Sequence, residues 1–480
     1  MHYNIRNIIS LNKKSYPLYK FFYNEIKRSI INYRISQNQK LPPSRILSKD
    51  LNISRTTALK IYDLLLFEGL IYSKKGSGYY VGYKQAINEV KDDKNNFSYP
   101  KLSKKSNLFK KYRYLSTDTF SKTSIAFRPG LPPLDVFPIN KWKNISNRYW
   151  SLSNPTDLSY APSEGLEQLR INISNYLKIY RNIRCNYNQI VITSGSLHSL
   201  YLSSNAILDS GDKIGMENPT FPRAYNLFKS LKAKVIPCGI DKEGIIIKDL
   251  NDKVKFIYTT PSNQYPLGVR MSLNRRIEIL NWISNNNSLI IEDDYDHEFS
   301  NLINSIPSLY SLDNEDRVVY LGTFNKLLHP SLRIGYMIVP KFMLESVKSI
   351  YEQSSRFVPS STQEILSTFI EKDYLNKHIR NVLETASERK KAFISSTKET
   401  LLIDKKENNG LHLIAKFKNK RNDLKVFKSL IKENVVAYPL SNYYITKKKE
   451  NGLVMGYSSV NIKVLKEKTE IINQILKQDI

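Results

Sequence analysis

The sequence predicts a multidomain α/β protein with a helical head at its N-terminal end. The chain has 480 residues, too many for one ordinary hydrophobic core. Residues 16–83 carry helical patterns, whereas short apolar runs alternate with helix-length segments from residue 125 to residue 480. Between these parts, residues 84–124 are rich in Lys, Asn, Asp and Ser, a composition that favours a flexible basic linker.

The net charge of +29 is concentrated toward the N-terminus. Residues 1–83 contain 14 Lys and Arg against 4 Asp and Glu, and residues 84–124 contain 10 against 4. A positive excess favours a nucleic acid as partner, because a polyanion releases counterions when it binds cationic side chains. A general bias toward Asn, Ile, Lys and Tyr along the whole chain is the alternative explanation of this charge.

A cytoplasmic location is expected. The hydrophobic share of 41% suits globular burial, and no window resembles the long uncharged apolar run of a membrane span. Residues 1–9 lack the features of a secretory leader. The two cysteines, Cys185 and Cys238, form neither a metal-ligand spacing nor a disulfide framework, which fits a reducing compartment.

The head is predicted to contain three helices and a hairpin. The first helix covers residues 18–30, the second opens at an N-cap candidate, Ser44, and ends at Leu51, and the third covers residues 55–68 behind the N-cap Ser54. Residues 70–81 read as a hairpin. The expected buried faces are Leu18, Phe21, Phe22, Ile26 and Ile30 in the first helix and Leu59, Tyr62, Leu65 and Leu66 in the third.

The third helix presents polar residues in its first turn, as the recognition helix of a helix-turn-helix does. A small helical bundle that binds protein is the alternative. Residues 41–45, 54–57, 68–71 and 76–81, however, closely resemble the GntR-type winged helix. This resemblance implies a double-stranded DNA partner, and the expected DNA-binding residues are Arg45, Ser54, Arg55, Thr56, Thr57, Lys74, Lys75 and Gly76.

The remainder of the chain is predicted to form a mostly parallel sheet with a smaller α+β lobe from about residue 345. The expected strands of the sheet are 189–193, 254–259, 288–291, 318–321 and 336–339. Those of the lobe are 412–417, 435–438 and 453–457.

Three polar groups of this large domain meet the needs of pyridoxal 5'-phosphate. That aldehyde cofactor requires a lysine for a Schiff base, an acid at its pyridine nitrogen and donors at a helix N-terminus for its phosphate. Lys326, Asp293 and the run 194–196 follow expected strands. Taken singly, each has an alternative: a solvated lysine, a helix cap, or a divalent-cation site in the acidic run 292–298.

Together these groups resemble fold-type I aminotransferases. Residues 129–132, 193–195, 217–219, 260–268, 292–296 and 322–326 carry this likeness, and with the winged helix they resemble the MocR branch of GntR regulators. The resemblance implies a Schiff base at Lys326, a pyridine-nitrogen contact from Asp293 and a phenolic-oxygen contact from Tyr295. It also implies phosphate binding by Ser194, Gly195, Ser196, Thr323 and Arg333, ring stacking by Phe221, an effector contact from Arg223, and a head-to-tail homodimer.

One departure bears on catalysis. Aminotransferases clamp the substrate carboxylate with a small-domain arginine, and the matching position here holds Val454. The sequence therefore favours a DNA-binding transcriptional regulator that binds pyridoxal phosphate and senses vitamin B6 metabolism. A regulator that senses an amino-acid-like effector through the cofactor, and an active aminotransferase, are the alternatives.

Overall fold

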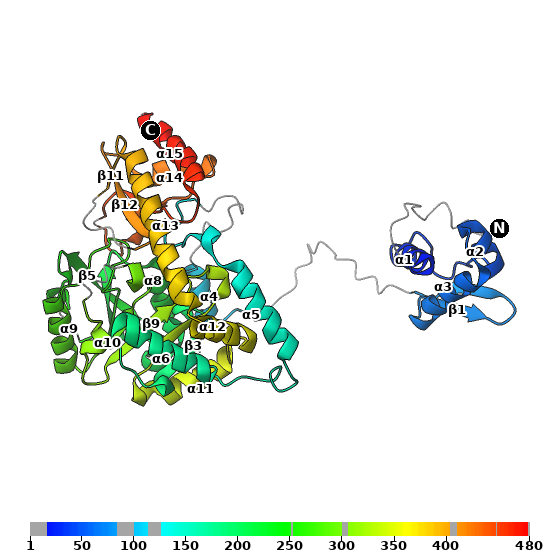
Figure 1. Cartoon of the computed structure of the whole chain (residues 1–480), viewed down its shortest axis with the longest axis horizontal. Helices are drawn as coiled ribbons and strands as arrows, with labels where there is room; N and C mark the ends of the chain where they lie inside the picture. The colour runs from blue at the N-terminus through cyan, green and yellow to red at the C-terminus, as the bar shows by residue number, and fades with distance from the viewer. Residues whose placement is uncertain are drawn as a thin grey trace. The chain divides into compact units, whose positions relative to one another are not determined.

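The computed structural model describes residues 17–83, 100–113, 126–250, 253–299, 306–403, 410–447 and 449–478. Its contacts divide the chain into two compact units, Met1–Pro100 and Lys101–Ile480 (Figure 1). No helix within the described ranges is long and apolar enough to cross a membrane. The predicted fold class, a winged helix-turn-helix followed by an α/β domain with a mostly parallel sheet, is confirmed.

The first unit contains the predicted head. Its helices are α1 (Leu18–Ile31), α2 (Ser44–Leu51) and α3 (Arg55–Phe67), and its hairpin pairs β1 (Ile71–Lys74) with β2 (Gly78–Val81). The buried Tyr62 ties α3 to the start of α2, because its hydroxyl donates to the carbonyl oxygen of Pro42 at 2.6 Å. Ser54 caps α3 as expected, since its hydroxyl oxygen accepts from the Thr57 N–H.

Several side chains of the head differ from the expectation. Leu18 is 48% exposed, and Ala58 and Ile61 are buried in α3 where Leu59 and Leu66 are only partly covered. The buried stripe of α3 is therefore shifted around the helix, because its partners α1 and α2 approach from a side that periodicity alone does not reveal. Ser44 lies inside α2 rather than capping it.

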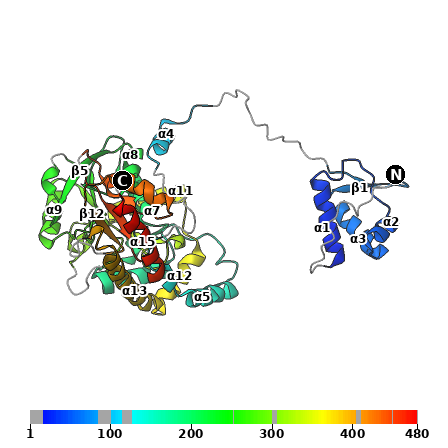
Figure 2. The same ribbon diagram turned by 90° about the horizontal axis from the view of Figure 1, so that it is seen from above.

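A short helix interrupts the predicted linker. Helix α4 (Lys104–Lys111) is capped by Ser103, whose hydroxyl accepts from the Ser106 N–H at 3.0 Å. It packs against α8 (Pro222–Ser230), and Figure 2 shows the two helices near each other. A helix of this length is only marginally stable in isolation. Its stability therefore depends on packing against α8, which the composition of the segment does not reveal. Residues 84–99 and 114–124 of the predicted linker lie outside the described residues.

The large lobe contains an eight-stranded sheet in the order β3-β10-β9-β8-β7-β4-β5-β6. Strands β9, β8, β7, β4 and β5 are parallel neighbours, and β10 runs antiparallel to both β3 and β9. The bounds are β3 (Ile190–Thr193), β4 (Lys213–Asn218), β5 (Lys234–Asp241), β6 (Gly244–Ile245), β7 (Phe256–Thr259), β8 (Leu289–Asp293), β9 (Val318–Thr323) and β10 (Gly335–Ile338).

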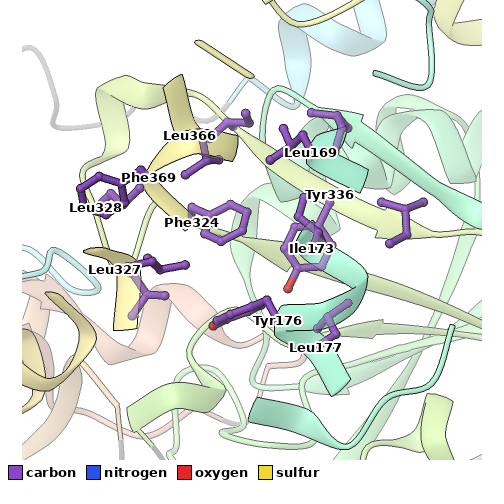
Figure 3. Packing of buried hydrophobic residues seen from close by; sticks show 14 of the residues in the cluster. Leu169, Ile173, Tyr176, Leu177, Phe324, Leu327, Leu328, Tyr336, Leu366 and Phe369 are labelled. Atoms are coloured by element: carbon purple, nitrogen blue, oxygen red, sulfur yellow. The ribbon is translucent and has the colours of Figure 1, made fainter. Parts of the chain in front are cut away.

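Helices cover both faces of this sheet. They are α5 (Ile139–Leu152), α6 (Glu167–Arg181), α7 (Ser196–Ile207), α8, α9 (Leu273–Asn285), α10 (Leu309–Leu312), α11 (Leu344–Ser354) and α12 (Ser360–Glu371). One core lies between α6, α12 and strands β3, β9 and β10. Figure 3 shows Phe324 inside it, among side chains that include Tyr336 and Leu366. The loop after β9 is thus anchored in the core.

The small lobe has an antiparallel sheet in the order β11-β12-β14-β13. Its elements are α13 (Tyr374–Thr397), β11 (Leu401–Ile403), β12 (His412–Phe417), α14 (Asp423–Lys432), β13 (Tyr438–Pro439), β14 (Leu453–Gly456) and α15 (Ile462–Lys477). The strands predicted at 412–417 and 453–457 are present. The strand expected at 435–438 is only the short β13.

The lobe boundary lies later than residue 345. Helices α11 and α12 cover the large sheet, and Leu375 and Ile379 of α13 belong to the same core as α12. Further along α13, Ala386 and Phe393 belong to the small-lobe core. Helix α13 therefore spans both lobes, as Figure 1 shows. A helical pattern reports one buried face but not which of two cores covers it.

Candidate functional site

A cavity of about 460 Å³ collects most of the residues predicted to hold a cofactor. It lies where β8 and β9 end and α7 and α8 begin, which is the usual ligand side of an open α/β sheet. The predicted residues that line it are Gly195, Ser196, Phe221, Arg223, Asp293, Tyr295, Thr323, Lys326 and Arg333.

Lys326 reaches into this cavity from a loop held at both sides. Phe324 and Leu327 are buried in the core, so the backbone of Lys326 between them is held in place. Its Nζ donates to the carbonyl oxygen of Gly130 at 2.9 Å, and a Cβ at Gly130 would lie 2.4 Å from that nitrogen. Burial lowers the pKa of Lys326, against the opposing influence of Asp296. A lowered pKa increases the share of neutral, nucleophilic amine.

Asp293 closes β8 and offers one oxygen to the cavity. Its Oδ2 accepts from the Tyr258 hydroxyl at 2.8 Å, whereas its buried Oδ1 accepts no hydrogen bond from any residue that the structure describes. Burial raises the pKa of Asp293 to about 6. An unsatisfied buried carboxyl oxygen is costly, and the N–H of a protonated pyridine ring would satisfy it. The polar groups at this end of the cavity therefore fit the ring of pyridoxal phosphate.

The other end of the cavity suits a phosphate. Gly195, Ser196, Thr323 and Arg333 line it together, and we call these four residues the phosphate cradle. Gly195 has φ +111° at the N-terminus of α7, and a Cβ there would lie 3.3 Å from Asn325 Nδ2. Backbone N–H groups at a helix N-terminus and a guanidinium are the donors that phosphate groups accept from in proteins.

Ser194 does not join the cradle through its side chain. Its hydroxyl is hydrogen-bonded to Nδ1 of His198, one turn into α7, at 3.0 Å. Sequence reasoning grouped Ser194 with Gly195 and Ser196 because they are adjacent. His198, four residues later in the sequence, could have indicated a local side-chain hydrogen bond to Ser194.

Aromatic side chains form much of the remaining wall. The Tyr295 hydroxyl donates to the carbonyl oxygen of Asn263 at 2.9 Å, and the Tyr295 ring centroid is 6.0 Å from Lys326 Nζ. The Phe221 ring stands perpendicular to the ring of Tyr265 at 5.7 Å between centroids. Sequence analysis did not assign the further lining residues Arg128, Tyr258, Tyr265, Asn325, Tyr438 and Tyr443 to the site. They come from separate segments, and of these residues Tyr258 and Tyr438 lie in predicted strands.

In the acidic run 292–298, three carboxylates other than Asp293 make contacts within the protein. Glu292 accepts from the backbone N–H groups of Leu309 and Tyr310, Asp294 pairs with Arg181 at 2.7 Å, and Asp296 accepts from Asn263. Within the described ranges, no group of three or more His, Cys, Asp or Glu side chains could hold a metal ion. The divalent-cation alternative thus gains no support.

The predicted DNA-binding residues lie on α2, α3 and the hairpin of the head. Arg45, Arg55 and Thr56 are exposed, while the Ser54 hydroxyl is occupied by the cap of α3. At the hairpin, Lys74, Lys75 and Gly76 are exposed, and Lys74 Nζ lies 5.0 Å from the Tyr80 ring centroid. Gly76 has φ +75°, a turn conformation that favours glycine.

Two known families match the chain. Residues 18–81 match the bacterial regulatory proteins of the gntR family, and residues 130–456 match the aminotransferases of class I and II. Among solved structures, an archaeal alanine:glyoxylate aminotransferase superposes with a TM-score of 0.70 at 24% identity, covering 79% of this chain and 96% of its own. This likeness shows the fold of the second unit.

Whole-length relatives combine both parts. The chain is 32% identical to the HTH-type transcriptional regulator YhdI of Bacillus subtilis, over 94% of each chain. It is 28% identical to the probable rhizopine catabolism regulatory protein MocR of Rhizobium meliloti, over 94% of this chain and 92% of that one. It is 25% identical to the pyridoxine biosynthesis transcriptional regulator PdxR of Corynebacterium glutamicum, over 91% and 90%.

The raised pKa of Asp293 predicts a pH-dependent stability difference in the cofactor-free protein. The folded-state pKa, about 6, lies above the unfolded value of about 3.9, so between these pH values the folded protein retains a proton that the unfolded chain releases. Wild-type stability contributed by this group therefore falls as pH rises through that window. Asp293→Asn should be more stable than wild type at pH 7 by up to about 3 kcal/mol, with no difference below about pH 4. Urea unfolding from pH 4 to 8 measures this, and a difference independent of pH would contradict it.

Proposed function

Since the chain belongs to the MocR subfamily of GntR transcriptional regulators, we propose that it binds pyridoxal phosphate in its aminotransferase-like domain and uses it to regulate transcription. The observation that carries this proposal is the open Oδ1 of Asp293 in the same cavity as Lys326 and the phosphate cradle. A link to vitamin B6 metabolism is supported by the likeness to a relative described as a pyridoxine biosynthesis regulator.

Each residue has a defined task in this proposal. Lys326 would hold the cofactor covalently, the Asp293 carboxylate would favour the protonated ring nitrogen, and Phe221 would contact the ring. Tyr295 would contact the phenolic oxygen, and the phosphate cradle would bind the phosphate. Bound pyridoxal phosphate supplies an electrophilic carbonyl carbon conjugated to an electron-withdrawing ring.

An amino-acid-like effector is a second candidate ligand, favoured by the position of Arg223 in the cavity wall. Aminotransferase turnover has less support. Val454 is fully buried in β14 and lies in one apolar cluster with Leu440 and Tyr443. A valine offers no charge to an α-carboxylate, so the bidentate contact that orients amino-acid substrates is missing at that position.

We further propose a head-to-tail homodimer in the cytoplasm. Trp150, Leu152, Leu158 and Tyr160 are between 56% and 74% exposed near one another in the sequence of the large lobe. Exposed apolar side chains of this size suit burial against a second copy. Two heads brought together by dimerisation could then occupy two half-sites on DNA.

Helix α8 is the proposed route from the cavity to the head. Its first residues, Pro222 and Arg223, line the cavity. Helix α8 also packs against α4, which lies between the head and the cavity residues in the chain. Leu108 and Tyr112 form the half-buried face of α4. A ligand that favours one position of α8 would therefore change how α4 docks, and only its differential affinity for the two positions can do so.

Absorbance spectroscopy tests the cofactor proposal. Full-length protein mixed with pyridoxal phosphate should develop a band near the visible edge that Lys326→Ala does not develop, because Lys326 is the lysine whose amine lines the cavity. Lys420→Ala, a substitution outside the cavity, is the matched control and should keep the band. A wild-type protein without the band would refute the proposal.

Arg55 should be needed for DNA binding. A duplex selected from random sequence by the wild-type protein should bind Arg55→Ala about tenfold or more weakly, because a base or phosphate contact from arginine contributes about 1–3 kcal/mol. Fluorescence anisotropy measures the affinity. Lys20→Ala, on α1 of the same head, is the charge-matched control. Equal losses in the two variants would mean that α3 does not enter the groove.

The α4 contact should transmit the cofactor signal. In Leu108→Ala/Tyr112→Ala, the cofactor band should remain, while the change in DNA affinity on adding pyridoxal phosphate should largely disappear, because the two half-buried side chains at α4 are lost. Asn107→Ala, an exposed position on α4, should respond as wild type does. A full response in the double variant would exclude this route.

A further inference from the structure

The hairpin of the head is extended by a third segment, residues 38–41, which runs along β2. Backbone hydrogen bonds of 2.9–3.0 Å join residues 38–41 to residues 79–81, and Lys40 pairs with Tyr80 in an antiparallel bridge. On its other side, Tyr80 pairs with Tyr72 of β1. Because directly paired residues point to the same face of a sheet, the side chains of Lys40, Tyr80 and Tyr72 stand side by side.

Two tyrosine rings support two lysine ammonium groups on this face. The rings of Tyr72 and Tyr80 are stacked, with 5.7 Å between centroids and 24° between planes. Lys74 Nζ lies 5.8 Å from the Tyr72 centroid and 5.0 Å from the Tyr80 centroid, and Lys40 Nζ lies 5.8 Å from the Tyr80 centroid. An ammonium group within about 6 Å of a ring centroid is attracted to the ring face. Tyr80 therefore attracts both lysines.

Hydrogen bonds orient the two rings. The Tyr72 hydroxyl donates to Oδ1 of Asn38 at 3.1 Å, and the hydroxyls of Ser77 and Tyr80 share a hydrogen bond of 2.7 Å. The bond to Ser77 lowers the pKa of Tyr80, and the charges of both lysines lower it further. The rings and the lysines thus form one connected surface at the hairpin.

The two lysines bring like charges together in a part of the head that is rich in cations. Residues 31–49 and 69–81 contain no Asp or Glu, and their cationic residues are Arg34, Lys40, Arg45, Lys49, Lys74 and Lys75. Glu68, which precedes the second segment, is paired with Lys27 at 2.5 Å. Like charges on one exposed surface repel each other, and anions beside them relieve that repulsion. The face of Lys40 and Lys74 therefore suits phosphate groups.

We propose that Lys40 and Lys74 form a lysine clamp on the phosphate backbone of double-stranded DNA, and that Tyr80 positions this clamp. Lys40 thereby joins the DNA contacts that the sequence predicted. Phosphate contacts fix the register of a protein on the duplex but carry no base information, so the clamp acts equally on every sequence. Support from the ring reduces the side-chain entropy that the lysines lose on binding. This inference rests on the proposed function, since it assumes that the head binds DNA.

Fluorescence anisotropy of the full-length protein at a series of salt concentrations tests the clamp. The probes are the duplex selected by wild type and an unrelated duplex of equal length. Lys40→Gln should weaken binding to both by the same factor, about fivefold at 0.1 M salt. It should also reduce the slope of log affinity against log salt by about one, because one cation fewer is displaced from the DNA.

Lys20→Gln, at an exposed lysine of α1, is the matched control and should keep the wild-type slope. An unchanged slope in Lys40→Gln would overturn the clamp. A loss confined to the selected duplex would also overturn it, because that result indicates a base contact. A wild-type protein that selects no duplex would instead defeat the proposed function.

A double-mutant cycle tests the positioning role of Tyr80. Tyr80→Leu removes the ring and should weaken binding to both duplexes about threefold, whereas Tyr80→Phe keeps the ring and should bind as wild type does. In Lys40→Gln/Lys74→Gln, Tyr80→Leu should have little further effect, because no ammonium group is left to position. Equal losses in the two backgrounds would show that Tyr80 does not act through the lysines. Thermal unfolding checks each variant, and Tyr80→Thr replaces Tyr80→Leu if the latter unfolds the head.

Discussion

The burial of the chain on both sides of Lys326 is the constraint on which the site depends. Phe324 packs on Tyr336 and Tyr176 with centroid distances of 5.5 and 5.9 Å, and Leu327 is fully buried. His378 of α13 adds a hydrogen bond to the Leu327 carbonyl oxygen at 2.9 Å. Moving this loop would expose large apolar side chains at about 1.5–3 kcal/mol each, so the backbone at Lys326 has a fixed position.

Burial also shifts the pKa values of two groups that line the cavity, Lys326 and Asp293. Desolvation lowers the pKa of Lys326 and raises that of Asp293, so each is displaced toward its neutral form. A ligand that brings a protonated ring nitrogen to Asp293 would relieve the cost of its ionised form. Cofactor binding and the protonation state of this carboxyl are therefore linked.

The two lobes meet around the cavity through backbone contacts. The Gly456 N–H in β14 donates to the carbonyl oxygen of Phe127, and the Thr220 N–H after β4 donates to the carbonyl oxygen of Tyr443 in the small lobe. Helix α13 contributes to both cores. The cavity is therefore lined by residues of both lobes, with Tyr438 and Tyr443 among those of the small lobe.

The sequence by itself determined the local elements and the kinds of residue in the site. The sequence predicted the cap at Ser54, the apolar runs of β7, β8 and β9, and the placement of Asp293 and Lys326 at or beyond the ends of strands, because periodicity is a local property. Tertiary structure decided the rest. It bonded Ser194 to His198, brought Tyr258 to Asp293, divided α13 between two cores and docked α4 on α8. The physical reason is that which face of an element is covered, and by what, depends on partners far away in the chain.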